Sequence, residues 1–126
     1  MSLKVLVIED DPRCTELLRA KLAGSEFDLT FVSTLAAGLA KLNAERWDRI
    51  ILDLGLPDSK DDATFYEVKA HRGEAKILVL TGDNDPSVRD HMRRAGADNV
   101  AVKGIDDRAA DLKFMLTHEM HKRKRK

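Results

Sequence analysis

The chain has 126 residues, of which 43% are hydrophobic and 35% are charged, and its 22 Lys and Arg side chains balance 22 Asp and Glu. This length fits one domain with a buried core, the apolar content excludes a disordered chain, and no apolar run reaches the ~18 residues of a membrane-spanning helix. The one cysteine, Cys14, excludes an internal disulfide framework, and the start of the chain lacks the layout of a secretory signal, so we expect a cytoplasmic protein.

Short apolar runs alternate with helical patterns along the chain. The runs predicted as strands are Leu3–Ile8, Phe27–Val32, Ile50–Leu52, Lys76–Leu80 and Asn99–Val102. Helical spacing between and after them predicts helices that begin at Pro12, after Ser33 or Thr34, at Ala63, at Ser87, and after Asp106 or Asp107. The last helix carries apolar residues as far as Met120, and Gly24 and Gly96 are placed to end the first and the fourth. Residues 54–62, rich in Gly, Pro, Asp and Ser, predict a loop.

Each predicted strand is followed by a segment long enough to form a helix. Parallel strands need crossovers of this size, so the pattern predicts an α/β fold with a doubly wound, five-stranded parallel sheet, right-handed crossovers and helices on both faces. Residues 1–120 form this single domain. The residues 122–126 are all basic, so residues 1–121 carry 17 basic against 22 acidic side chains. We expect 121–126 to be a solvated basic tail or the start of a linker, without specific nucleic-acid binding.

Polar side chains gather at the ends of four strands, where an open parallel sheet forms its binding sites. The first strand is followed by Glu9, Asp10 and Asp11, the third by Asp53, the fourth by Thr81, and the fifth by Lys103. Carboxylates of this kind suit Mg²⁺, which prefers oxygen ligands and keeps several waters. An aspartate can act as a nucleophile toward phosphorus, and an ammonium and a hydroxyl stabilise the transferred charge. The rim therefore indicates phosphoryl chemistry with Mg²⁺.

Four segments around these strand ends resemble the receiver domain of two-component response regulators. They are Val5–Pro12 (VLVIEDDP), Ile51–Ser59 (ILDLGLPDS), Leu78–Gly82 (LVLTG) and Ala95–Gly104 (AGADNVAVKG). The resemblance covers residues 3–120 and implies a flavodoxin-like sheet with the strand order 2-1-3-4-5. It also implies a phosphoacceptor domain of a phosphorelay that switches partner interactions. Such a domain catalyses only its own phosphorylation and dephosphorylation, so it is not an enzyme in the usual sense.

The resemblance assigns roles to the acidic rim. Asp53 matches the aspartate that is phosphorylated, and Glu9 and Asp10 match the acidic pair that organises Mg²⁺. The metal set implied is Glu9, Asp10, Asp53 and the backbone carbonyl of Gly55. The implied phosphoryl donor is a histidine kinase or a histidine phosphotransfer protein, and the output partner is unknown.

The remaining site residues include both matches and departures. Thr81 and Lys103 match the hydroxyl and the lysine that contact the phosphoryl group. Val100 stands where the family usually has a switch aromatic, which puts the usual coupling between that ring and the threonine in question. Gly104 stands where a proline often follows the lysine through a cis bond, so we expect a trans bond here. The loop 59–62 lacks the glycine that is common there.

The resemblance also implies an output face formed by the fourth helix, the fifth strand and the fifth helix. Its candidate exposed residues are Arg89, Arg93, Arg94 and Asp107. The same face could pair two copies in a homodimer. The main alternative is an interaction module of receiver fold that works without phosphorylation, which the absent aromatic favours weakly. A phosphatase of the aspartyl-phosphate type ranks low because Gly55 stands where a second acid would be needed.

Several other residues have simpler interpretations. Cys14 has a core-facing spacing and is expected to be a buried structural thiol. Trp47 is expected to cover the edge or the bottom of the sheet. The four histidines are scattered over helices without the spacing of metal ligands, so we expect surface roles for them.

Overall fold

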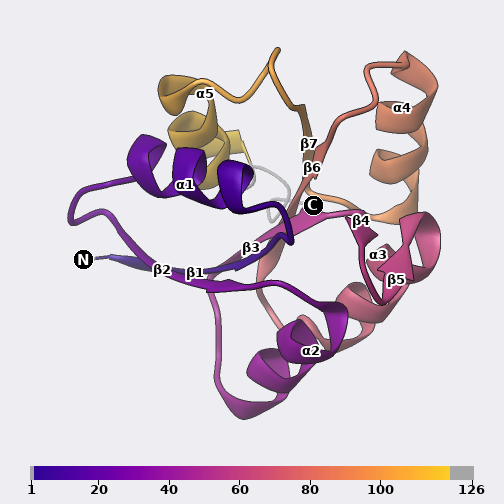
Figure 1. Ribbon diagram of the computed structural model, residues 1–126, viewed down its shortest axis with the longest axis horizontal. Helices are drawn as coiled ribbons and strands as arrows, with labels where there is room; N and C mark the ends of the chain where they lie inside the picture. Colours follow the sequence, from indigo (N-terminus) through magenta and orange to yellow (C-terminus); the bar gives the residue numbers. More distant parts are fainter. Residues whose placement is uncertain (1, 120–126) are drawn as a thin grey trace.

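The computed structural model describes residues 2–119 and has a five-stranded parallel sheet at its centre (Figure 1). The strands are β1 (Leu3–Ile8), β2 (Phe27–Val32), β3 (Arg49–Asp53), β6 (Lys76–Thr81) and β7 (Asn99–Val102). Their order is β2-β1-β3-β6-β7, and all neighbouring pairs are parallel. Both the predicted α/β class and the predicted strand order are confirmed.

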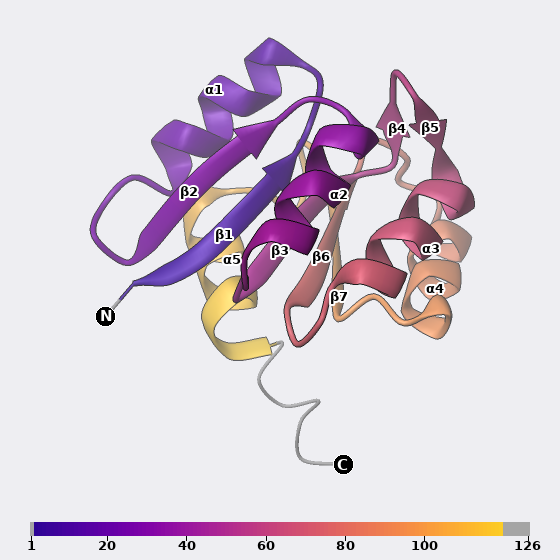
Figure 2. The same ribbon diagram turned by 90° about the horizontal axis from the view of Figure 1, so that it is seen from below.

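Helices cover both faces of this sheet (Figure 2). One face carries α1 (Pro12–Lys21), α5 (Ala109–Phe114) and the π-helical turn η1 (Met115–Glu119), and the other carries α2 (Leu35–Ala44), α3 (Asp61–His71) and α4 (Pro86–Ala95). Among residues 2–119, none of the helices is both long enough and apolar enough to span a membrane.

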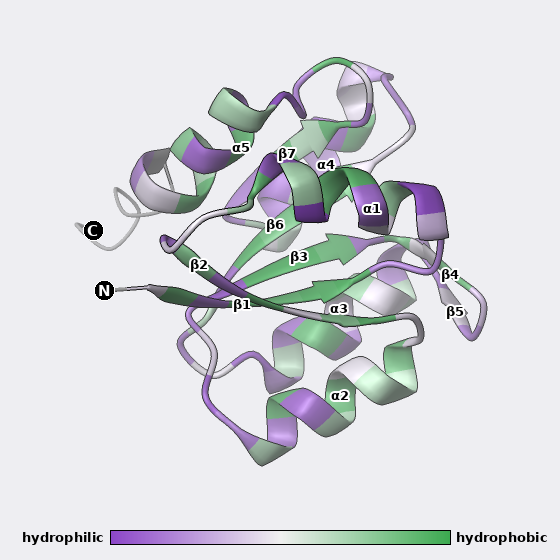
Figure 3. Cartoon of the chain, turned by 60° about the vertical axis from the view of Figure 1, so that its left-hand side comes forward, coloured by the Kyte–Doolittle hydropathy of each residue, from purple (hydrophilic) through white to green (hydrophobic). Residues whose placement is uncertain are grey.

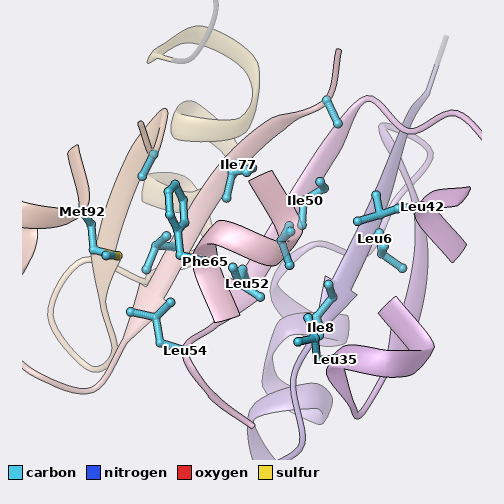
Figure 4. Close-up of a cluster of buried hydrophobic side chains, with 14 of the residues drawn as sticks. Leu6, Ile8, Leu35, Leu42, Ile50, Leu52, Leu54, Phe65, Ile77 and Met92 are labelled. Atoms are coloured by element: carbon cyan, nitrogen blue, oxygen red, sulfur yellow. The ribbon is translucent and has the colours of Figure 1, made fainter. Parts of the chain in front are cut away.

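The middle residues of the central strands are apolar because they serve two cores, one on each face of the sheet (Figure 3). Successive side chains of a strand point to opposite sides of the sheet. Val5 and Val7 therefore pack with α1 and α5, whereas Leu6 and Ile8 pack with the other three helices. Figure 4 shows the core between the sheet and α2, α3 and α4, in which Phe65 of α3 is fully buried.

The structure shows which of two candidate residues, Ser33 or Thr34, caps the N-terminus of α2. The Oγ1 of Thr34 accepts a hydrogen bond from the Ala37 N–H at 3.0 Å, so Thr34 is the N-cap and the exposed Ser33 is not. An N-cap hydroxyl satisfies one of the backbone donors that the first helical turn leaves free. We expect Thr34→Ala to lower the free energy of unfolding by about 1 kcal/mol in urea titrations. Ser33→Ala is the matched control, and an equal loss in both variants would contradict this assignment.

The last helix begins later than predicted. Its N-cap is Arg108, and the predicted caps Asp106 and Asp107 have other partners. Asp106 accepts a hydrogen bond from the Val102 N–H, and Asp107 accepts one from the Gly104 N–H. The prediction is wrong because both carboxylates bond back to the end of β7 instead of forward to the helix. Met120 and the tail 121–126 lie outside the described residues.

The segment predicted as a loop contains more structure than expected. It holds a small antiparallel pair, β4 (Gly55–Leu56) and β5 (Ser59–Lys60), and α3 begins at Asp61, two residues before the predicted start. Asp61 has a φ of 54°, a left-handed backbone conformation at the place where the missing glycine was noted. Asp58 accepts hydrogen bonds from the first two N–H groups of α2, and these lower the pKa of its carboxyl. This carboxylate ties the segment to α2.

Candidate functional site

The predicted site residues come together because they follow or end four neighbouring parallel strands, whose carboxyl ends lie side by side. β1, β3, β6 and β7 are consecutive in the sheet order, and β2 lies outside them at the edge. The register pairs Ile8 with Leu52, Asp53 with Leu80, and Thr81 with Val102. The residues that follow or end these strands therefore lie side by side, as expected for an open parallel sheet.

The ammonium of Lys103 is shared by two carboxylates. Its Nζ lies 3.1 Å from Glu9 Oε1 and 3.7 Å from Asp53 Oδ1. The Glu9 side chain is only 1% exposed, against 13% for Asp53 and 25% for Lys103. The Gly55 N–H donates to Asp53 Oδ1 at 3.3 Å, and the Asp11 N–H donates to Glu9 Oε2 at 3.1 Å. Two carboxylates and one ammonium are thus held close together in a largely buried site.

This arrangement changes how the central groups bind protons. Burial raises the pKa of the Asp53 carboxyl from 3.8 to about 7, the Glu9 carboxylate adds to the rise, and Lys103 opposes it. Burial also disfavours the ammonium of Lys103, but the carboxylates of Asp53 and Glu9 outweigh that effect and raise its pKa. The site therefore holds more negative charge than its own lysine can neutralise.

The acidic side chains fit a divalent cation. Glu9, Asp10 and Asp53 each offer a carboxylate oxygen, and these oxygens lie within 4.8 Å of one another. Glu9 Oε1 is buried, and the Lys103 ammonium lies 3.1 Å from it, but this oxygen accepts no hydrogen bond among the described residues. A buried carboxylate oxygen in this condition is stabilised by a cation. Hard oxygen ligands of this number suit Mg²⁺.

Thr81 lies on the same cavity as Asp53. This cavity has a volume of about 560 Å³ and is also lined by Asp62, Asp83 and His91. Thr81 is buried, its Oγ1 accepts a hydrogen bond from the Asp83 N–H at 3.1 Å, and its carbonyl accepts one from the Lys103 N–H at 2.7 Å. Thr81 and Asp53 therefore line the same cavity, and Thr81 is tied by hydrogen bonds to the backbone of Asp83 and Lys103.

Cys14 differs from its predicted role, and the surface residue His91 makes a contact that was not predicted. Cys14 is half-buried, and its Sγ lies 3.8 Å from Asp11 Oδ2. Burial raises the pKa of this thiol although Lys103 acts in the opposite direction. His91 is paired, since its Nε2 lies 2.9 Å from Asp62 Oδ2 of α3. The spacing of residues along each helix could not predict either contact, because both depend on how the elements pack in the fold.

The structure also shows the surroundings of Trp47, Gly104 and Val100. Trp47, just before β3, is buried in the core, and its Nε1 donates to the Lys41 carbonyl at 3.0 Å. The described residues contain no cis peptide bond, which agrees with the trans bond expected between Lys103 and Gly104, and Gly104 has a φ of 80°. Val100 is buried in the core.

The charge of Asp53 predicts how stability depends on pH in the absence of metal. Because its pKa is raised, the folded protein holds this proton more tightly than the unfolded chain, so stability falls as pH rises from 4 through 7. In EDTA at pH 8, we expect Asp53→Asn to unfold with a free energy higher by about 1–3 kcal/mol than the parent chain. This difference should shrink toward pH 4.

Asp90→Asn, at an exposed position on α4, is the control for this pH effect. Urea titrations at several pH values measure the free energies. Parallel curves for the parent chain and Asp53→Asn would contradict the raised pKa.

Comparison with known proteins agrees with this geometry. The family model of the response regulator receiver domain matches residues 5–113, so the chain belongs to that family. The chain is 32% identical over 114 residues to the KDP operon transcriptional regulatory protein KdpE of Escherichia coli (strain K12), covering 89% of this chain and 50% of that protein. It is also 32% identical over 104 residues to the transcriptional activator protein IrlR of Burkholderia pseudomallei, covering 82% and 45%. The chain thus spans about half the length of these curated relatives.

Solved structures show the same fold. A CheY-like response regulator receiver domain protein from Methanospirillum hungatei JF-1 has a TM-score of 0.83 at 20% identity, covering 99% of this chain and 98% of that one. The receiver domain of the sensor histidine kinase PA1611 from Pseudomonas aeruginosa PAO1, solved with a magnesium ion in its active-site cleft, has a TM-score of 0.81 at 21% identity, covering 96% and 99%. These structures show that the chain has the fold of a receiver domain, in agreement with the family match.

Proposed function

We propose that Asp53 is the residue that takes the phosphoryl group. The observation that carries this proposal is the position of the Lys103 ammonium between the Asp53 and Glu9 carboxylates. A carboxylate oxygen of Asp53 attacks the phosphorus of a phosphohistidine, an O–P bond forms, and the P–N bond breaks with its electron pair leaving on the imidazole. Attack by water on the same phosphorus later returns the carboxylate and inorganic phosphate, which resets the domain.

The neighbours of Asp53 act on the charge of this reaction. Lys103 pairs with the transferred oxygens, and the Thr81 hydroxyl donates a hydrogen bond to one of them. Because Asp53 must be ionised to attack, its raised pKa makes a nearby cation useful at neutral pH.

The residues that would hold Mg²⁺ are Glu9, Asp10, Asp53 and the carbonyl of Gly55. This set is supported by the three clustered carboxylates and by the burial of Glu9 Oε1, which accepts no hydrogen bond among the described residues. When bound, the ion neutralises charge on the phosphoryl oxygens and on the acidic side chains.

The wider role follows from this assignment. The donor is a histidine kinase or a histidine phosphotransfer protein, and the domain has no catalytic activity beyond its own phosphorylation and dephosphorylation. Family membership supports this function over an interaction module that ignores phosphorylation. The boundaries of the domain at residues 1 and 120 and its location in the cytoplasm stay predictions.

Incubation of the purified chain with acetyl phosphate and Mg²⁺ tests the proposal. We expect intact mass spectrometry to show one added phosphoryl group, peptide mapping to locate it on Asp53, and EDTA to prevent its addition. A phosphoryl group on another residue, or none with any donor, would contradict the proposal.

A further inference from the structure

The turn after β7 fixes the peptide groups on both sides of Lys103. The N–H of Val102 donates to Asp106 Oδ2 at 3.0 Å, and the N–H of Gly104 donates to Asp107 Oδ1 at 2.9 Å. The Lys103 N–H itself donates to the carbonyl of Thr81. Two consecutive aspartates thus hold the backbone from which the site lysine extends.

The two aspartates connect this turn to different helices. Asp107 pairs with Lys21 of α1, whose Nζ lies 2.8 Å from the Asp107 carbonyl and 3.5 Å from Oδ2. Asp106 pairs with Arg89 of α4 through the same Oδ2 that accepts from Val102. One carboxylate oxygen therefore joins the Ala101–Val102 peptide group, at the end of the strand that leads to Lys103, to α4.

The position of α4 depends strongly on such polar contacts. Met92 is its only buried residue, with Val88 and Ala95 partly buried. Its polar contacts are Arg89 with Asp106, Arg93 with Asn99, His91 with Asp62, and the Ala95 carbonyl with Lys69. Only the first of these reaches the turn that carries Lys103. A helix with so little buried area can shift when one polar contact changes.

We infer that Asp106 is a positioning residue for Lys103 and that its ion pair with Arg89 transmits the state of Asp53 to α4. The inference rests on the proposed function of Asp53. A phosphoryl group on Asp53 adds negative charge and draws the Lys103 ammonium away from Glu9. The peptide groups around Lys103 follow, Asp106 moves with them through Val102, and Arg89 carries the displacement into α4.

The site has a second feature that favours a polar connection. Val100, in the strand that leads to Lys103, is a small apolar side chain buried in the core, and it offers α4 no polar group. By contrast, the Arg89 and Asp106 side chains are 38% and 29% exposed, so their pair can rearrange without disturbing the core.

The experiment measures phosphoryl incorporation and the response of α4 separately on the full chain. Acetyl phosphate and Mg²⁺ supply the phosphoryl group, intact mass reports incorporation, and amide hydrogen exchange of residues 87–95 reports α4. In the parent chain we expect phosphorylation to change exchange in α4 by about fivefold or more. Arg89→Gln should incorporate phosphate normally and lose that change, whereas Arg89→Lys should keep it.

Variants at Asp106 separate the two uses of its carboxylate. Asp106→Asn keeps an acceptor for the Val102 N–H but removes the negative charge that pairs with Arg89, so we expect near-normal incorporation and a weakened response of α4. Asp106→Ala removes the acceptor as well and should slow incorporation by about tenfold or more, because Lys103 is then misplaced. The double variant Arg89→Gln/Asp106→Asn should lose no more of the α4 response than Arg89→Gln alone, as required of one shared interaction.

Arg108→Gln is the matched control, since Arg108 pairs with Asp111 on the same side of the molecule without contacting the turn at Lys103. It should behave like the parent chain. A full α4 response in Arg89→Gln, an equal loss in Arg108→Gln, or a phosphorylated parent chain with unchanged α4 would each overturn the inference. Absence of phosphoryl incorporation in the parent chain would instead overturn the proposed function, and the inference with it.

Discussion

Asp53→Asn is expected to take up no phosphoryl group from acetyl phosphate and Mg²⁺, whereas the parent chain takes up one. The amide oxygen is a poor nucleophile and carries no charge to attack phosphorus. Asn keeps the shape of the side chain and an acceptor for the Gly55 N–H, so the loss does not come from unfolding. Intact mass after incubation measures the result.

The control for this variant is Asp90→Asn, which removes an exposed carboxylate from α4 and should be phosphorylated like the parent chain. Urea titrations run in parallel verify that Asp53→Asn is folded. Undiminished phosphoryl uptake in Asp53→Asn would mean that another carboxylate is the acceptor.

Lys103→Met is expected to slow phosphoryl uptake by about 10²–10³-fold at saturating Mg²⁺, the usual loss when one preorganised charge stabiliser is removed. The substitution keeps an unbranched apolar side chain but removes the cation between the Asp53 and Glu9 carboxylates. Lys103 also opposes the rise in the pKa of Asp53, so the reaction should require a higher pH in the variant. Time courses of uptake at several pH values measure both effects.

Lys60→Met is the matched control because Lys60 is exposed on β5 in the segment that follows Asp53. It removes the same charge from the same side of the molecule without touching the carboxylates. Equal rates in the two variants would mean that Lys103 acts only through the general field of the protein.

The site was predictable from sequence because its placement follows from the topology. In a parallel sheet, the carboxyl ends of all strands lie on the same side. Once the strands at 3–8, 50–52, 76–80 and 99–102 are recognised, the residues that follow or end them are expected to lie together. These residues are Glu9, Asp53, Thr81 and Lys103. The apolar runs are short, but each is followed by a helix-sized segment, and such crossovers place successive strands parallel in the sheet.

The turn contacts were not predictable in the same way. Asp106 and Asp107 are good candidates for a helix N-cap, yet in the fold they bond to Val102 and Gly104. Similarly, Asp58 accepts from the N–H groups of α2, a helix that precedes it in the chain. Short polar side chains can satisfy several nearby donors, and the exact path of the turn decides among them.

A crystal grown with Mn²⁺, which shares the oxygen preference of Mg²⁺ and is located by anomalous scattering, tests the site most directly. We predict one strong anomalous peak among the carboxylates of Glu9, Asp10 and Asp53 and the carbonyl of Gly55, with the Lys103 ammonium still beside Asp53. A peak elsewhere, or Glu9 and Asp10 turned away from Asp53 in a protein saturated with the ion, would contradict the site as described.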